Sequence, residues 1–156
     1  MLVVDDDPDV VGMLQFALED SGFSVRTATD GKNALTALEE HAPDVIVLDL
    51  MMPNLDGFGL LRSRRQRNLA PDARVVIVTC KTSERDYVRG WELGADEYVT
   101  KPFEPDRLVR IVRELAFAQP EVLQQRRDAE LQKAELLERL ESAFSRPRVA
   151  PRAAAS

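Results

Sequence analysis

The stretch that decides the fold is "VIVLDLMMPNLDG", residues 45–57. It opens with a short apolar run, rich in Val and Ile and without polar alternation, which is typical of a parallel strand covered on both faces. The run ends on a carboxylate, Asp49, and a loop containing Pro53 and Gly57 follows. A single acid in that position is ordinary turn chemistry. The role of Asp49 therefore has to be inferred from the rest of the sequence.

Length and composition indicate one globular domain with a short remainder. The chain has 156 residues, of which 44% are hydrophobic, enough to bury one core. Its longest apolar run is far shorter than the roughly 20 residues of a membrane span. The N-terminus also lacks the basic start and cleavage site of a signal peptide. We therefore expect a cytoplasmic protein with no membrane partner. The single cysteine, Cys80, cannot form an internal disulfide, and we expect it to be a small buried side chain.

Charge is distributed unevenly along the chain. Residues 1–118 contain 14 Lys and Arg against 21 Asp and Glu, a net charge of −7, so the remainder contributes +1 to the overall −6. Direct binding of nucleic acid needs a basic face that pairs with phosphates. The acidic main body therefore argues against nucleic acid as a direct ligand, and the nearly neutral tail supplies no strong basic arm.

Short apolar runs alternate with amphipathic segments of helical length. Apolar side chains recur at about 3.6-residue spacing in the longer segments, and capping residues such as Asp7, followed by Pro8, mark where helices begin. This alternation predicts a doubly wound α/β fold with five parallel strands and five helices. The expected strands are Leu2–Val4, Ser24–Ala28, Val45–Leu48, Val75–Val78 and Glu97–Thr100.

The composition changes after Ala118. We assign residues 1–118 to the α/β domain, 119–145 to a helical extension, and 146–156 to a disordered tail of Pro, Arg and Ala. Leu137, Leu140 and Phe144 have coiled-coil spacing, but the same register places Glu130 and Lys133 in the seam, so the coiled-coil signal is weak. The extension can pair with a second copy, dock on a separate effector, or simply continue the preceding helix into solvent.

Polar, reactive side chains follow four of the five expected strands. Asp5 and Asp6 follow the first strand, Asp49 ends the third, Thr79 ends the fourth, and Lys101 follows the fifth. The carboxyl ends of parallel strands meet at one edge of the sheet, where α/β proteins bind ligands. We therefore expect these five side chains to lie together. The second strand delivers no such residue, which suits an edge position.

Three carboxylates at one edge require a proton or a cation to relieve their repulsion. Oxygen ligands with room for water suit Mg²⁺, with Mn²⁺ as a substitute, whereas the lack of nearby Cys or His argues against zinc. Lys101 adds a positive charge and Thr79 a hydroxyl on the other side of Asp49. A phosphoryl group would be stabilised there, so Asp49 is a candidate nucleophile.

Four motifs together resemble the receiver domain of bacterial two-component response regulators. They are "LVVDDDPDV", "DVIVLDLMMPNLDGFGLL", "VVIVTCKTSERD" and "GADEYVTKPF", and the resemblance covers about residues 1–118. It implies a flavodoxin-like sheet with strand order 2-1-3-4-5. The chain would then be similar to a single receiver of the chemotaxis-regulator type that carries a helical extension.

The resemblance also implies a role for each site residue. Asp49 would accept the phosphoryl group, with Thr79 and Lys101 sensing it. Tyr98 would be the aromatic switch, and Lys101-Pro102 would be a cis peptide. The Mg²⁺ ligands would be Asp6, Asp49 and the backbone carbonyl of Met51, with Asp5 binding through water.

Partners follow from the same resemblance. The phosphoryl donor would be a sensor histidine kinase or a phosphotransfer protein, and residues 83–118 would form the surface that controls an unidentified effector. A homodimer through that surface, or through the tail helix, stays open. Asp96 and Glu97 match the acids of the usual dimer, but Tyr87, Arg107 and Ile111 do not match its other positions.

Two other functions compete with the phosphorylated regulator. A phosphorylation-independent scaffold of receiver form would typically lack one of the acids or the lysine. A phosphatase of the haloacid-dehalogenase type would place its nucleophile on the first strand and its metal-binding acids after the lysine, an order that this chain does not have. We therefore expect no enzyme activity beyond the chain's own phosphorylation and dephosphorylation. The resemblance implies that the positions two residues beyond Asp49 and Thr79, here Met51 and Lys81, tune dephosphorylation. Neither residue is a carboxylate or amide that could orient a water, which predicts slow dephosphorylation.

Overall fold

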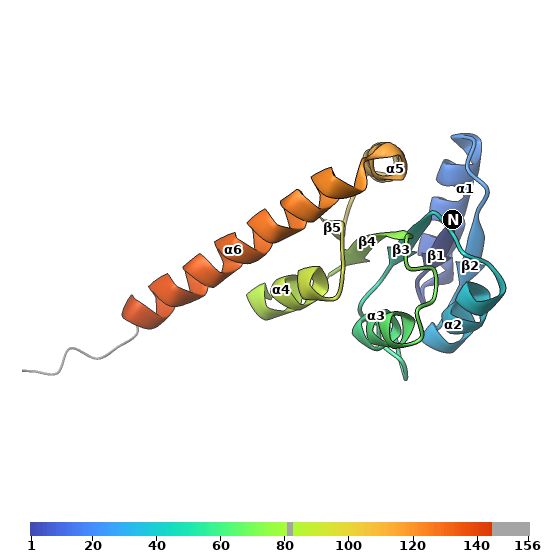
Figure 1. Ribbon diagram of the computed structural model, residues 1–156. Helices are drawn as coiled ribbons and strands as arrows, with labels where there is room; N and C mark the ends of the chain where they lie inside the picture. Colours follow the sequence, from blue (N-terminus) through green and yellow to red (C-terminus); the bar gives the residue numbers. More distant parts are fainter. Residues whose placement is uncertain (81–82, 145–156) are drawn as a thin grey trace, which may run out of the picture.

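The computed structural model describes residues 1–80 and 83–144 and contains a central sheet with helices on both faces (Figure 1). The strands are β1 (Leu2–Val4), β2 (Arg26–Ala28), β3 (Val45–Leu48), β4 (Arg74–Thr79) and β5 (Glu97–Thr100). The helices are α1 (Pro8–Asp20), α2 (Gly31–Glu40), α3 (Gly57–Gln66), α4 (Glu84–Glu92), α5 (Pro105–Phe117) and α6 (Pro120–Phe144). The predicted disordered tail, residues 146–156, lies outside the described residues.

All five strands are parallel and lie in the order β2-β1-β3-β4-β5. This confirms the predicted flavodoxin-like topology with a C-terminal helix. β1 and β3 are neighbours, with Val4 opposite Leu48. At the other side, Thr79 at the end of β4 lies opposite Thr100 at the end of β5.

The sheet separates two apolar clusters. Alternate strand residues point to opposite faces, so Val4 and Leu48 contribute to one cluster while Val3 and Val47 contribute to the other. The first cluster packs under α2, α3 and α4, and the second under α1 and α5. β3 is completely buried, as its uninterrupted apolar run predicted.

The structure differs from the sequence-based expectations at three local points. β2 begins at Arg26 rather than Ser24, and β4 extends one residue further at each end than predicted. Cys80 is exposed rather than buried, because β4 ends at Thr79 and the chain leaves the sheet there. Ser83 caps α4, which follows, by accepting from the Asp86 amide.

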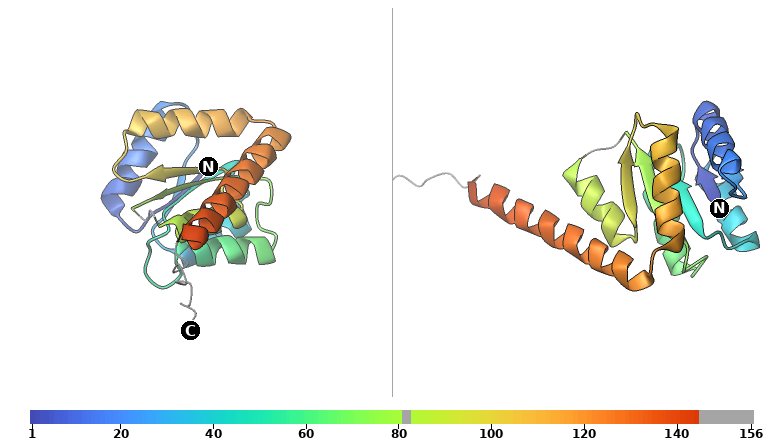
Figure 2. Two further views of the ribbon diagram at one scale, coloured as in Figure 1. Left: turned by 90° about the vertical axis from the view of Figure 1, so that its left-hand side faces the viewer. Right: turned by 90° about the horizontal axis from the view of Figure 1, so that it is seen from above.

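α6 is a helix separate from α5. Ala118 has an extended backbone, with φ −69° and ψ 140°, and Pro120 opens the next helix. Figures 1 and 2 show α6 turning away from α5, passing beside α4 and projecting beyond the domain. Over the described parts of the chain, no helix combines the length and apolarity needed to cross a membrane.

Candidate functional site

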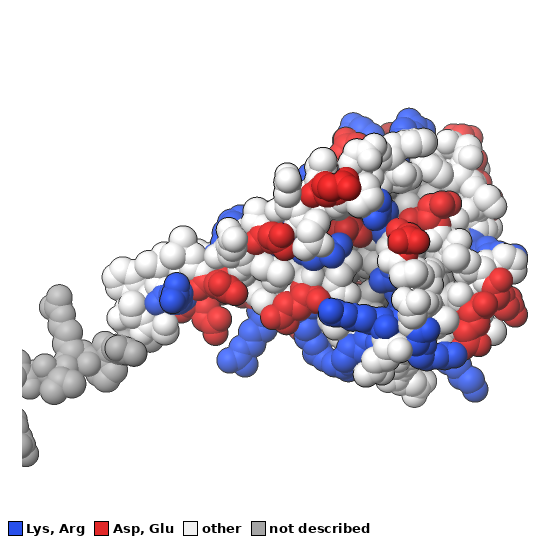
Figure 3. Space-filling model, in the orientation of Figure 1, with Lys and Arg blue, Asp and Glu red and all other residues white. Residues whose placement is uncertain are grey.

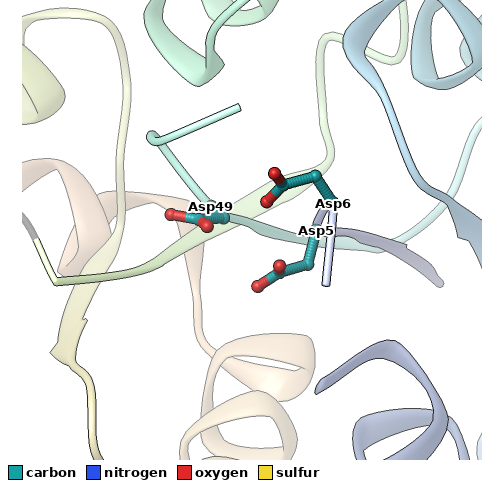
Figure 4. Close-up of side chains that lie close together, drawn as sticks. All are labelled: Asp5, Asp6 and Asp49. Atoms are coloured by element: carbon teal, nitrogen blue, oxygen red, sulfur yellow. The ribbon is translucent and has the colours of Figure 1, made fainter. Parts of the chain in front are cut away.

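The three predicted carboxylates meet at the carboxyl edge of the sheet. The Asp49 amide donates to the Val4 carbonyl at 2.9 Å, so the β1–β3 pairing continues to the residue that follows each strand. One oxygen from each of Asp5, Asp6 and Asp49 lies within 4.8 Å of the others. Figure 4 shows the side chains of Asp5 and Asp6 directed to the same side as Asp49. The predicted convergence is therefore present.

The two inner acids are buried and hydrogen-bonded by the backbone. Asp5 is 2% exposed and Asp49 is 5% exposed, whereas Asp6 is exposed. Asp5 Oδ1 accepts from the Asp7 amide at 2.9 Å, and Asp49 Oδ1 accepts from the Met51 amide at 3.0 Å. Each inner acid keeps its second oxygen for another partner.

That partner is Lys101, which bridges the two inner acids. Its Nζ donates to Asp5 Oδ2 at 2.6 Å and to Asp49 Oδ2 at 3.2 Å. The Lys101 amide donates to the Thr79 carbonyl at 3.0 Å, so the lysine follows directly from the β4–β5 pairing. The Lys101-Pro102 peptide bond is cis. Acids from β1 and β3 and the amine that follows β5 thus form one charged cluster.

Burial and charge act in opposite directions on the titration of this cluster. Burial raises the pKa of Asp5, and the nearby Asp49 adds to this, while hydrogen bonds from Lys101 and the Asp7 amide oppose it. Burial by itself would lower the pKa of Lys101, but Asp5 and Asp49 outweigh it and raise that pKa. Lys101 is therefore held in its protonated form against the acids.

The donor set fits a hard divalent cation. Three carboxylates face one ammonium, which leaves two negative charges uncompensated if all three acids are ionised. The donors are oxygens, and exposed Asp6 leaves the cluster open to solvent. These properties match Mg²⁺, which keeps several waters and uses few protein carboxylates.

Gly57 supports the loop that follows Asp49, a role that the sequence analysis missed. A Cβ at Gly57 would lie 2.5 Å from the Asp49 carbonyl oxygen and 2.8 Å from Leu50 Cα. The Gly57 amide donates to the Leu50 carbonyl at 3.1 Å. Only a residue without a side chain allows α3 to begin this close to Asp49. The sequence placed Gly57 in the loop after Asp49 but did not indicate this backbone contact.

Thr79 and Tyr98 lie on the adjacent pair of strands. Thr79 is completely buried at the end of β4. The Tyr98 ring centroid lies 5.1 Å from that of Tyr87 on α4. The Tyr98 hydroxyl is buried and has no hydrogen-bond partner among the described residues. Burial, with smaller contributions from Asp86, Tyr87 and Asp49, raises the Tyr98 pKa far above its usual value, so the phenol is neutral.

Residues 1–113 match the response regulator receiver domain family. The chain belongs to this family. The receiver is a signalling domain whose only chemistry is its own phosphorylation and dephosphorylation. The phosphatase alternative is therefore set aside.

Known proteins resemble the receiver part of the chain. The alkaline phosphatase synthesis transcriptional regulatory protein PhoP of Bacillus subtilis is 45% identical over 124 residues, which is 77% of this chain and 51% of that protein. The chain thus spans about half the length of this relative. The Vibrio cholerae chemotaxis protein CheY4 is 31% identical with a TM-score of 0.69, covering 73% of this chain and 95% of CheY4. The receiver domain of the Francisella response regulator 1452 is 37% identical with a TM-score of 0.68, covering 74% of this chain and 93% of that domain.

Proposed function

We propose that this receiver accepts a phosphoryl group on Asp49 and uses it to control a partner. An Asp49 carboxylate oxygen attacks the phosphorus of the donor, so an O–P bond forms at Asp49 as the bond between phosphorus and the donor breaks. With a histidine kinase or a phosphotransfer protein as donor, the leaving group is an imidazole nitrogen, which takes up a proton. The site's remaining groups stabilise charge and perform no further covalent step.

The roles of the site residues follow from their contacts. Lys101 holds Asp49 through one oxygen and is placed to pair with the incoming phosphoryl oxygens. Mg²⁺, with Mn²⁺ as a substitute, would be held by Asp5, Asp6, Asp49 and the Met51 backbone carbonyl. Asp5 would act through water. The cation supplies charge neutralisation of the phosphoryl oxygens when it is bound.

Thr79 and Tyr98 would convert the phosphoryl group into a surface change. The added negative charge attracts the Thr79 hydroxyl, and the Tyr98 ring moves toward the space that Thr79 leaves. The surface that responds is α4, β5 and α5, on which Tyr98 lies. This is a two-state switch biased by local electrostatics. This surface would control an unidentified downstream effector.

Two structural assignments belong to the same proposal. Residues 1–118 would be the receiver, and residues 119–145 a helical extension of the receiver. Dimerisation through the tail helix would need its coiled-coil positions. Dimerisation through α4, β5 and α5 would need Asp96 and Glu97, which already pair with Arg127 and Arg126 of α6, so such a dimer would have to displace α6. PhoP of Bacillus subtilis is named a transcriptional regulatory protein, but the similarity covers 51% of it. Control of transcription by the present chain would therefore require a partner or a further domain.

The observation that carries the proposal is the contact of Lys101 Nζ with both buried acids, 2.6 Å from Asp5 and 3.2 Å from Asp49. The test is incubation of the full chain with Mg²⁺ and acetyl phosphate, followed by intact mass measurement. We expect a gain of one phosphoryl group that is absent without the cation and absent in Asp49→Asn.

A matched control uses Asp56→Asn. Asp56 is a nearby acid that caps α3 by accepting from the Gly59 amide and lies outside the carboxylate cluster. This variant should still gain one phosphoryl group. No gain in the wild type would instead favour the phosphorylation-independent scaffold, and a gain that persists in Asp49→Asn would move the acceptor elsewhere.

A further inference from the structure

The surface made by α4 and β5 is covered by a segment of the same chain. Leu123, near the start of α6, belongs to the apolar cluster under α1 and α5, whereas Leu131 packs against the cluster under α2, α3 and α4. α6 therefore passes around the edge strand β5, from one face of the sheet to the other (Figure 2). Covering an edge strand with a helix is one way in which proteins keep it from pairing with another chain.

The first part of α6 is anchored by an ion pair between a partly exposed arginine and a buried acid. Arg127 Nη2 lies 2.7 Å from Asp96 Oδ1, and Arg127 Nε donates to the Ala95 carbonyl at 3.1 Å. Asp96 is 3% exposed, and its other oxygen accepts from the Val75 amide at 2.8 Å. Separating Arg127 from Asp96 would leave a buried carboxylate without its cation, which is costly. We expect this anchor to persist in every functional state.

The second part of α6 is attached through Tyr87. The Tyr87 hydroxyl donates to Glu130 Oε2 at 3.1 Å, and Ala134 is buried one turn further along. The Tyr87 ring lies 5.8 Å from Trp91 and 5.1 Å from Tyr98, centroid to centroid. Tyr98 and Glu130 also line one cavity of about 340 Å³ between α4, β5 and α6. Tyr87 is thus a direct link between α6 and the residue proposed as the switch.

The far end of α6 presents apolar side chains to the solvent. Leu136, Leu137 and Leu140 are 57%, 43% and 46% exposed, although they are apolar. Figure 3 shows charges of both signs where α6 meets the domain, and a largely uncharged surface toward its projecting end. Residues 130–144 therefore meet α4 through the groups around Tyr87 and along a second cavity that Glu138 and Glu141 line together with Arg85 and Arg89 of α4.

We propose that phosphorylation of Asp49 loosens residues 130–144 from α4 while Arg127 keeps the start of α6 in place. The inference rests on the proposed function, because it uses the movement of Tyr98 toward Thr79. That movement withdraws one of the rings against which Tyr87 packs, so the Tyr87 hydroxyl loses its fixed position opposite Glu130. The buried, unpartnered hydroxyl of Tyr98 makes its present position costly, which favours a move to any site that offers a partner.

The α4–β5 surface is consequently a helix-binding surface, and α6 of the same chain occupies it. It fits an amphipathic helix that offers a carboxylate to the Tyr87 hydroxyl and a small apolar side chain beside it, as Glu130 and Ala134 do. Loosening α6 exposes that surface. Coupling between two equilibria is reciprocal, so a variant that weakens the α6 contact also favours the phosphorylated state.

The test is hydrogen exchange, followed by mass spectrometry, on the full chain in Mg²⁺ with and without acetyl phosphate. Intact mass is recorded on the same samples. We expect the exchange rate in residues 130–144 to rise about tenfold on phosphorylation. A change of this size corresponds to the loss of one hydrogen bond to a charged group. Residues 120–128 should stay protected, and Asp49→Asn should show neither change.

Each outcome separates the two proposals. A gain of one phosphoryl group with unchanged or slower exchange in residues 130–144 overturns this inference and leaves the proposed function standing. Absence of the mass gain overturns the proposed function, and this inference with it. Equal loosening of residues 120–128 overturns the role of Arg127 as an anchor.

A mild variant tests the link itself. Tyr87→Phe removes only the hydroxyl and should raise exchange in residues 130–144 without acetyl phosphate, leaving a smaller further increase on phosphorylation. Arg139→Ala, at an exposed position of the same segment, is the matched control and should behave like the wild type. Identical exchange in Tyr87→Phe and wild type would show that the hydroxyl does not hold α6.

Discussion

Buried carboxylates lie at both edges of the same parallel sheet, in opposite electrostatic situations. At the carboxyl edge, three acids share one cation, Lys101. At the amino edge, Asp96 pairs with Arg127, accepts from the Val75 amide and also lies within electrostatic range of the buried Arg64. Both clusters bring together residues that are far apart in sequence. They differ in whether the negative charge is fully compensated within the chain.

This difference indicates that the carboxyl-edge cluster is a site for chemistry and that the amino-edge pair has a structural role. An undercompensated cluster gains stability when a cation or a positively charged group arrives, so its energy depends on what is bound. A fully paired buried acid gains nothing further and is damaged by the loss of its partner. Ligands should therefore change the carboxyl edge, and mutations should do most harm at the amino edge.

The largest expected effect comes from breaking the amino-edge pair. Arg127→Ala should lower the free energy of unfolding by about 3 kcal/mol, because Asp96 would stay buried without its cation. Urea unfolding followed by circular dichroism measures this. The adjacent Arg126 pairs with Glu97, but those side chains are 49% and 27% exposed. Arg126→Ala should therefore cost less than about 0.5 kcal/mol, and equal losses in both variants would refute the distinction.

The next effect is steric and lies at the carboxyl edge. Gly57→Ala should destabilise the protein by about 2 kcal/mol, because its Cβ would meet the Asp49 carbonyl oxygen at 2.5 Å. Gly12→Ala is the matched control, since an exposed Gly inside α1 has nothing within 4 Å of a new Cβ. That variant should gain about 0.8 kcal/mol from helix propensity. Thermal unfolding of both variants would show opposite shifts; shifts of the same sign would count against the close approach.

A smaller effect distinguishes the two edges by their response to cations. Mg²⁺ at about ten times its dissociation constant should stabilise the wild type by about 1.4 kcal/mol. Asp6→Asn should lose most of this gain, since Asp6 is the exposed member of the cluster. Asp20→Asn removes an exposed acid at the far end of α1, and this variant should keep the stabilisation by Mg²⁺. The measurement is thermal unfolding in MgCl₂ against NaCl at equal ionic strength, and an equal response of all three proteins would argue against a bound cation.

The two edges also differ in how far the sequence predicted them. The carboxyl-edge cluster could be predicted from the sequence because each of its residues follows an apolar run, and parallel topology brings the strand ends together. The strand order came from the family resemblance, not from the runs themselves. Gly57 was read only as a turn residue, because its contact with the Asp49 carbonyl depends on how closely α3 begins to the strand.

The amino-edge cluster was not predicted at all. Arg127 and Asp96 are joined by helix packing, and nothing in the periodicity of α6 identifies the face that meets β5. The same limit applies to Glu130 and Lys133, which looked like defects in a coiled-coil seam. In the folded chain Glu130 accepts from Tyr87, and both residues line the cavity beside Tyr98. Glu130, a polar residue in the apolar stripe, thus has a hydrogen-bond partner within the chain.

The smallest expected effect concerns the rate at which the carboxyl edge loses its phosphoryl group. Met51 lies two residues beyond Asp49 and is 53% exposed, so its thioether faces the solution from which water would attack. Met51→Asn would offer an amide that can orient this water and should speed hydrolysis about fivefold, which is roughly 1 kcal/mol of barrier. Met13→Asn, at an exposed methionine of α1, should leave the rate unchanged. Loss of the phosphoryl mass over time measures both; a wild-type phosphoform that decays within seconds would show that water is already positioned without Met51. Lys81, the other residue expected to slow hydrolysis, lies outside the described residues, so Met51 is the position where the structure makes this test specific.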